Sequence, residues 1–172
     1  MHRSKTKKVF KHAKAVTNVS GTIGKVMEKL FALQDVRTIH NTVDSSLFNY
    51  SNSIPDPKFK FIHVSTLKEH QKNSSGILET TAKLTRQRND FELVIVGPAS
   101  EQFKRKAMSL GLATVIKFTG EIPYTEVAKQ MQEAAVLILF SRYENFPCVI
   151  VEALCCGLPG NKFRCWWNKR SH

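Results

Sequence analysis

Residues 91–140 read FELVIVGPASEQFKRKAMSLGLATVIKFTGEIPYTEVAKQMQEAAVLILF, in which apolar runs alternate with segments of helical pattern. The runs Phe91–Val96, Val115–Phe118 and Ala135–Phe140 are typical of strands, and the last is continuous enough to predict burial on both faces. Ser100–Leu110 and Tyr124–Glu133 predict helices, with Gly97-Pro98 and Gly111 as stop signals. Such alternation with short connections predicts a parallel sheet covered by helices.

The pattern continues on both sides of this stretch. Strands are predicted for Phe59–Val64, Ala15–Val19 and Val36–Ile39, with Asn41–Tyr50 as turn and loop and Ser51–Lys58 as a linker with two prolines. Helices are predicted for Asn73–Leu84, for Cys148–Cys156 before Gly157, and for a segment with Ile23, Val26, Met27, Leu30 and Phe31 on one face. The expected fold class is α/β, a Rossmann-like parallel sheet with helices on both faces.

The chemistry lies in residues 141–159, SRYENFPCVIVEALCCGLP. Glu144 falls in the loop after a strand, and Glu152 falls about one turn into the next helix, so both face the edge where α/β sheets bind ligands. The amides of residues 146–149 would lie at the helix N-terminus, where the helix dipole attracts a diphosphate. A carboxylate at Glu152 accepts hydrogen bonds from the two hydroxyls of a ribose. Together these groups suit a nucleotide sugar.

This stretch resembles the Glu-x7-Glu signature of family 4 retaining glycosyltransferases of the GT-B fold. Five further blocks resemble that family in order and spacing: VTNVS (16–20), IHNTVDSSLF (39–48), HVSTLKEHQKN (63–73), ELVIVG (92–97) and VIKFTGEIP (115–123). The resemblance implies transfer of a sugar from a nucleotide sugar to an acceptor hydroxyl with retention, in polysaccharide or glycan biosynthesis.

The resemblance also implies site roles. Glu152 is expected to hold the nucleotide ribose, Glu144 to contact the donor sugar as the catalytic carboxylate, and Lys72 to pair with the donor diphosphate. Asn145, Phe146 and Pro147 complete the expected donor site. The family's usual arginine is replaced by Thr66, which cannot neutralise a phosphate. Lys72 and helix amides would therefore have to neutralise the donor diphosphate. The implied partners are a nucleotide sugar and a glycan or lipid-linked acceptor, with no metal and no other cofactor.

The resemblance divides the chain into residues 1–50, the end of an N-terminal domain and a connection, and residues 51–159, the nucleotide-sugar-binding domain. Residues 160–172 depart from the family. Reverse translation of GNKFRCWWNKRSH with one base dropped gives VISSDVGGIKEV, the expected continuation, and Trp166-Trp167 forces the Gly-Gly. We therefore expect a frameshifted tail, an incomplete GT-B fold and a fragment without turnover.

Charge is concentrated at the ends. Of 26 basic residues, six lie in residues 1–14 and four in residues 160–172, which leaves 16 against 14 acidic residues between, a net of +2. A nearly neutral body argues against nucleic-acid binding and allows peripheral contact with an anionic inner-membrane surface. The cysteines and the absence of a signal peptide predict a cytoplasmic protein with reduced thiols. The alternatives are a non-enzymatic nucleotide-binding fragment and a basic membrane- or nucleic-acid-binding module.

Overall fold

The computed structural model describes residues 3–51 and 58–159, and the chain divides into two compact units. The smaller unit holds the residues up to Thr42 together with Asn145–Cys148, and the larger unit holds Val43–Glu144 and the residues from Val149 on. Residues 52–57 of the predicted linker and the predicted frameshifted tail lie outside the described residues, so both stay predictions.

The smaller unit is a short parallel pair of strands with two helices. Its elements are α1 (Arg3–His12), β1 (Val16–Asn18), α2 (Gly21–Phe31) and β2 (Val36–Thr38), and Val16 pairs with Val36. Ser20 begins α2 by accepting a hydrogen bond from the Ile23 amide, as N-cap serines do. The helix α1 was not predicted, because its sequence is dominated by lysines; Phe10 anchors it by an edge-to-face contact with Phe31.

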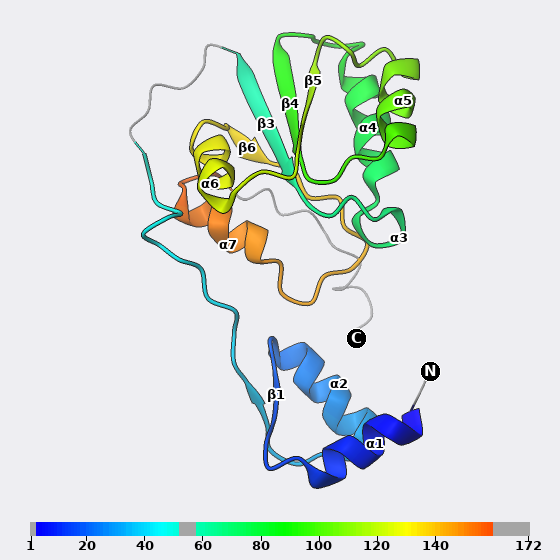
Figure 1. Ribbon diagram of the computed structural model, residues 1–172, viewed down its shortest axis with the longest axis vertical. Coiled ribbons are helices and arrows are strands. Elements are labelled where there is room, and N and C mark those ends of the chain that lie inside the picture. Colours follow the sequence, from blue (N-terminus) through cyan, green and yellow to red (C-terminus); the bar gives the residue numbers. More distant parts are fainter. Residues whose placement is uncertain (1–2, 52–57, 160–172) are drawn as a thin grey trace. The chain divides into compact units, whose positions relative to one another are not determined.

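The larger unit is a four-stranded parallel sheet in the order β5-β4-β3-β6 (Figure 1). Its strands are β3 (Phe59–Val64), β4 (Phe91–Val96), β5 (Ile116–Gly120) and β6 (Val136–Leu137). Its helices are α3 (Glu69–Lys72), α4 (Ser74–Leu84), α5 (Glu101–Ser109), α6 (Tyr124–Gln132) and α7 (Cys148–Cys155), of which α7 begins at the last residue of the smaller unit. The predicted α/β class with a parallel sheet is confirmed.

Helices cover both faces of this sheet, α4 and α5 on one side and α6 and α7 on the other (Figure 1). Alternation along β4 explains the layering, because successive side chains of a strand point to opposite faces. Leu93 and Ile95 pack with Ile77 of α4. Val94 and Val96 pack with the α6 and α7 residues Val127, Ala128, Met131 and Ala153. Each face of the sheet therefore has its own apolar core.

In this unit one expectation needs correction, and one helix was not predicted at all. The Ala135–Phe140 run was predicted to be a strand buried on both faces, but β6 covers only two residues, and in the described part of the chain it pairs with β3 alone. Leu137 and Leu139 are buried while the residues between and beside them are partly exposed, which is the alternation of an edge strand. The short helix α3 was not predicted either, because four residues are too few to show a helical period.

Candidate functional site

The site lies where the chain reverses its direction across the sheet. From β3 the chain proceeds to β4 and β5 on one side and then returns to β6 on the other side of β3. In open α/β sheets, ligands bind outside the carboxyl ends of the strands at this switch point, because the loops after the two strands diverge there. The loop after β3 leads to Lys72, and the loop after β6 leads to Glu144.

Lys72 and Glu144 form an ion pair at this point. The Lys72 Nζ lies 2.5 Å from Glu144 Oε1, and the two side chains are only 15% and 11% exposed. A pair shielded to this degree is screened less than a surface pair. An anion that approached Lys72 would compete with Glu144, and the released carboxylate could then accept hydrogen bonds from hydroxyl groups.

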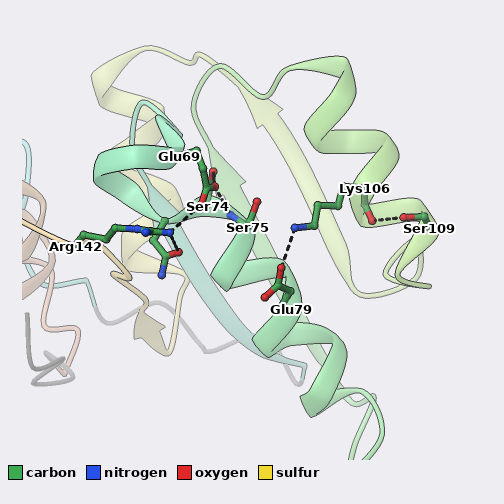
Figure 2. Close-up of polar contacts among 8 residues, drawn as sticks. Glu69, Ser74, Ser75, Glu79, Lys106, Ser109 and Arg142 are labelled. Atoms are coloured by element: carbon green, nitrogen blue, oxygen red, sulfur yellow. Dashed lines mark hydrogen bonds and ion pairs between the residues drawn. The ribbon is translucent and has the colours of Figure 1, made fainter.

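Arg142 ties the two loops together. Its backbone amide donates to the Gln71 carbonyl at 2.7 Å, and its Nη2 donates to Asn73 Oδ1 at 2.8 Å and to Glu69 Oε1 at 3.2 Å. Figure 2 shows the Arg142 side chain reaching toward Glu69 beside the start of α4. These bonds hold the segment that carries Glu144 against the segment that carries Lys72.

The second carboxylate oxygen of Glu69 caps α4 from outside the helix. It accepts hydrogen bonds from Ser75 N at 2.8 Å and from the Ser74 hydroxyl at 2.9 Å (Figure 2). Burial raises the pKa of Glu69, but the Ser75 and Ser74 hydrogen bonds and the Arg142 charge outweigh it, so the net pKa is lowered. Asn73, the residue at the N-cap position, makes no side-chain cap bond, so Glu69 supplies the missing acceptor.

Glu152 lies within α7, and its side chain has a partner in α6. Glu152 is 6% exposed, and its Oε1 accepts a hydrogen bond from the Tyr124 hydroxyl at 2.9 Å. Burial raises the pKa of Glu152, and the Tyr124 bond only partly offsets that rise. A buried carboxylate with so few donors retains acceptor capacity, which the two hydroxyls of a ribose could use.

Gly97 lets the loops after β3 and β4 meet closely. A Cβ at this position would lie 2.0 Å from the Ser65 carbonyl oxygen, and the Gly97 φ is +134°, which L side chains rarely adopt. Beside this contact an open groove of about 580 Å3 runs between the starts of α4 and α5. Its walls include Thr66, Lys68 and Ser100.

The remaining predicted site residues fall in the smaller unit. Phe146 stacks on His40 with ring centroids 5.4 Å apart, Asn145 is exposed and Pro147 is half-buried. Cys148, which begins α7, accepts a hydrogen bond through its Sγ from the Asn41 side-chain Nδ2 at 3.2 Å. The donor-binding role expected for Asn145, Phe146 and Pro147 therefore stays a prediction.

The described residues contain neither a metal-binding cluster nor a membrane-spanning helix. Over residues 3–51 and 58–159, no three histidine, cysteine, aspartate or glutamate side chains gather closely enough to hold a metal ion. Within the same ranges no helix has the length and apolarity needed to cross a membrane.

The chain belongs to the family described as glycosyl transferases group 1, whose model matches residues 47–160, well over half of the chain. It is 27% identical over 161 residues to the lipopolysaccharide 1,6-galactosyltransferase of Salmonella typhimurium strain LT2. That match covers 87% of this chain and 44% of the relative, so the chain spans less than half of the relative's length.

Two solved structures show the same fold. The Anabaena protein Alr3699/HepE, solved in complex with UDP and glucose, has a TM-score of 0.78 at 20% identity, and the match covers 100% of this chain and 52% of that chain. Sucrose-phosphate synthase from Thermosynechococcus elongatus has a TM-score of 0.77 at 20% identity, and the match covers 92% of this chain and 42% of that chain. Both likenesses support the GT-B type of architecture.

Several residues of this site were not identified from the sequence. Tyr124, Glu69 and Arg142 contact the predicted residues or the segments that carry them, yet each looked like an ordinary surface residue. A signal was present for two of them. Tyr124 is the first residue of α6, directly after the GEIP block, and Arg142 lies two residues before Glu144. Position next to a motif could therefore have marked both as candidates.

Proposed function

We propose that the larger unit binds a nucleotide-sugar donor, and that the protein serves the transfer of this sugar to an acceptor hydroxyl with retention at the anomeric carbon. The observation that carries the proposal is the shielded Lys72–Glu144 ion pair at the switch point of the sheet. Membership of the glycosyl transferases group 1 family supports it.

Lys72 is proposed to neutralise the donor diphosphate, which becomes the leaving group. In the transfer, the bond from the anomeric carbon to the diphosphate breaks, a bond to the acceptor oxygen forms, and the acceptor proton leaves with a phosphate oxygen. Negative charge grows on the diphosphate as its bond breaks, and a fixed ammonium stabilises that charge. The diphosphate would replace Glu144 as the partner of Lys72.

Glu144 is proposed to turn to the donor sugar once Lys72 has a new partner. As a carboxylate it only accepts hydrogen bonds, so it selects hydroxyl groups. Glu152 is proposed to accept the two ribose hydroxyls. The resemblance supports donor contacts by Asn145, Phe146 and Pro147 as well.

The proposal requires no metal ion, because Lys72 and main-chain amides near residues 146–149 would supply the positive charge. EDTA is therefore expected to leave nucleotide binding unchanged.

The acceptor is proposed to be a glycan or a lipid-linked glycan, the class to which the substrate of the Salmonella relative belongs by its name.

The test is calorimetric titration of the chain with UDP and GDP. We expect one of them to bind, and we expect Lys72→Ala and Glu152→Ala each to weaken binding about tenfold, the effect of losing one charge-assisted contact. Lys104→Ala and Glu101→Ala remove a surface ion pair on α5 and are matched controls without effect. If neither nucleotide binds at millimolar concentration, the proposal is wrong.

A transfer assay tests whether this chain is itself an active enzyme. The chain is incubated with labelled nucleotide sugars and glycan acceptors. Product whose formation needs Glu144 would show an active enzyme and contradict the expected lack of turnover, whereas binding without product agrees with an inactive fragment and with a non-enzymatic nucleotide-binding fragment.

We also propose that the smaller unit contacts an anionic membrane surface. The exposed lysines of α1 (Lys5, Lys7, Lys8 and Lys11) accompany exposed apolar side chains of the same unit. Among the latter, Val9 is 65% exposed and Leu30 is 46% exposed. Basic residues attract anionic headgroups while apolar ones enter the interface.

A further inference from the structure

His63 is a completely buried histidine in the middle of the sheet of the larger unit. It lies on β3 with 0% exposure, beside Ile95 of β4 in the register of the sheet. Its Nδ1 lies 2.8 Å from the Ile138 carbonyl oxygen, and its Nε2 lies 2.7 Å from Ser65 Oγ. A buried polar ring is costly unless its nitrogens are hydrogen-bonded, and here both are.

The partners determine which nitrogen carries the proton. A carbonyl oxygen can only accept, so Nδ1–H donates to Ile138 and Nε2 is the acceptor for the Ser65 hydroxyl. Ser65 Oγ in turn accepts the Leu67 amide at 3.0 Å. Burial, helped by the Lys72 charge, outweighs the raising effects of the Ile138 bond and Glu144, so the pKa of His63 is lowered to about 4. The neutral ring therefore persists at neutral pH.

The segment held by this chain of bonds has an uncommon backbone. Leu67 and Asn73 have φ values of 55° and 51°, in the left-handed region that non-glycine residues seldom adopt. Between them lies α3, whose last residue is Lys72. Such residues persist only where surrounding contacts hold them. At Leu67 these contacts are the Ser65 hydroxyl on its amide and the Ser74 hydroxyl on its carbonyl, at 3.1 Å.

We propose that His63 is a positioning residue for Lys72. By orienting the Ser65 hydroxyl, it holds the Leu67 turn and hence the direction of α3, so that the Lys72 ammonium meets Glu144 and, on donor binding, the diphosphate. The second half of this inference rests on the proposed function. A histidine that only filled the core would stabilise the sheet without directing Lys72.

The test compares a nucleoside diphosphate with its nucleoside, because only the diphosphate meets Lys72. UDP and uridine are titrated into the full chain, or GDP and guanosine if GDP is the nucleotide that binds. His63→Leu and Ser65→Ala are expected to weaken diphosphate binding about tenfold, the loss of one charge-assisted contact. Nucleoside binding should change less than about twofold. His63→Gln, which keeps an acceptor for Ser65, should restore most of the difference.

Two controls separate positioning from packing. Ile95→Val loosens the same layer of the core beside His63 and should leave the ratio of the two affinities unchanged. In a Lys72→Ala background, His63→Leu should not change that ratio further. Equal weakening of both ligands by His63→Leu, or a further fall of the ratio without Lys72, would overturn the proposal.

A measurement without nucleotide keeps this inference distinct from the proposed function. The Lys72 side chain is shielded by its pair with Glu144, so it should react slowly with acetic anhydride, followed by mass spectrometry. His63→Leu is expected to speed Lys72 acetylation relative to that of Lys104, whose side chain is 41% exposed. If Lys72 reactivity is unchanged, the positioning role is wrong, even if the chain binds nucleotide. If it rises in a chain that binds no nucleotide, only the proposed function is wrong.

Discussion

Glu152 illustrates at the scale of one residue how a binding group can cost stability. Burial raises its pKa above the ordinary value of 4.5, so the folded protein holds the proton more tightly than the unfolded chain does. The free energy of unfolding therefore falls as the pH rises from the pKa of Glu152 in the unfolded chain through its raised pKa in the folded protein. Below both pKa values the carboxyl is protonated in both states, so this group costs no stability there.

Removing this charge should therefore stabilise the protein. We expect Glu152→Gln to have a higher melting temperature than the wild type at pH 7, and we expect the difference to vanish below pH 4.5, the ordinary value. Differential scanning fluorimetry across this range measures both. Glu121→Gln, a change at an exposed position, is the control and should leave the melting temperature unchanged both at pH 7 and below pH 4.5. A destabilised Glu152→Gln variant at pH 7 would contradict this prediction.

Two glycines with positive φ differ in the space around them. Gly97→Ala should lower the free energy of unfolding by about 3 kcal/mol or more, because the new Cβ would overlap the Ser65 carbonyl and the backbone is strained. Gly111→Ala meets nothing within 4 Å and should cost about 1 kcal/mol for the left-handed backbone alone. Urea denaturation compares the two variants, and equal losses would show that the close approach is not a constraint.

At the scale of elements, the connection between β3 and α4 is held by groups that lie outside the helix they serve. Glu69 caps α4 across the intervening α3, and Arg142 arrives from the loop after β6. The segment that carries Lys72 is therefore stabilised by contacts from several elements rather than by its own helical propensity.

Glu69→Ala should lower the free energy of unfolding by about 1 kcal/mol, the usual cost of a lost cap. It should also speed hydrogen exchange in the first turn of α4. Glu79→Ala removes a surface ion pair with Lys106 further along the same helix and should cost less than about 0.5 kcal/mol. If the two variants are equally stable, Glu69 is not the cap of α4.

At the scale of the whole molecule, charge is unevenly distributed along the chain. The formal charge is +12, and the excess of basic over acidic residues lies in residues 1–14 and 160–172, because the residues between them hold 16 basic and 14 acidic side chains. Replacement of Lys5, Lys7, Lys8 and Lys11 by glutamine should weaken binding to phosphatidylglycerol vesicles at least about tenfold, since each lysine near such a surface contributes about 1 kcal/mol.

The matched control replaces four lysines of the larger unit, Lys83, Lys104, Lys106 and Lys129. Vesicle sedimentation at low and high salt measures both variants, and binding should fall with salt because the attraction is screened. If the control loses as much binding as the α1 variant, the attraction reflects net charge alone and the smaller unit is not a membrane contact.

Local pattern was sufficient for most of the elements. The segments Phe59–Val64 and Phe91–Val96 became β3 and β4 with the predicted bounds, because most side chains of a central parallel strand are apolar. Ser100 and Gly111 marked the ends of α5, since cap positions have their own residue preferences. The resemblance, which depends on the order of motifs, likewise indicated a glycosyltransferase from the sequence alone, and the match to the glycosyl transferases group 1 family confirms that coarser assignment.

Only the tertiary structure decided which side chains meet. Lys72 pairs with Glu144 across 72 positions of the chain, and Tyr124 with Glu152 across 28. The left-handed turn at Leu67 depends on a histidine that hydrogen-bonds to Ile138, 75 positions away. The Lys72–Glu144 and His63–Ile138 contacts follow from the placement of β6 beside β3. That order depends on burial of both faces of the sheet at once, whereas a local sequence pattern records the preference of one segment at a time.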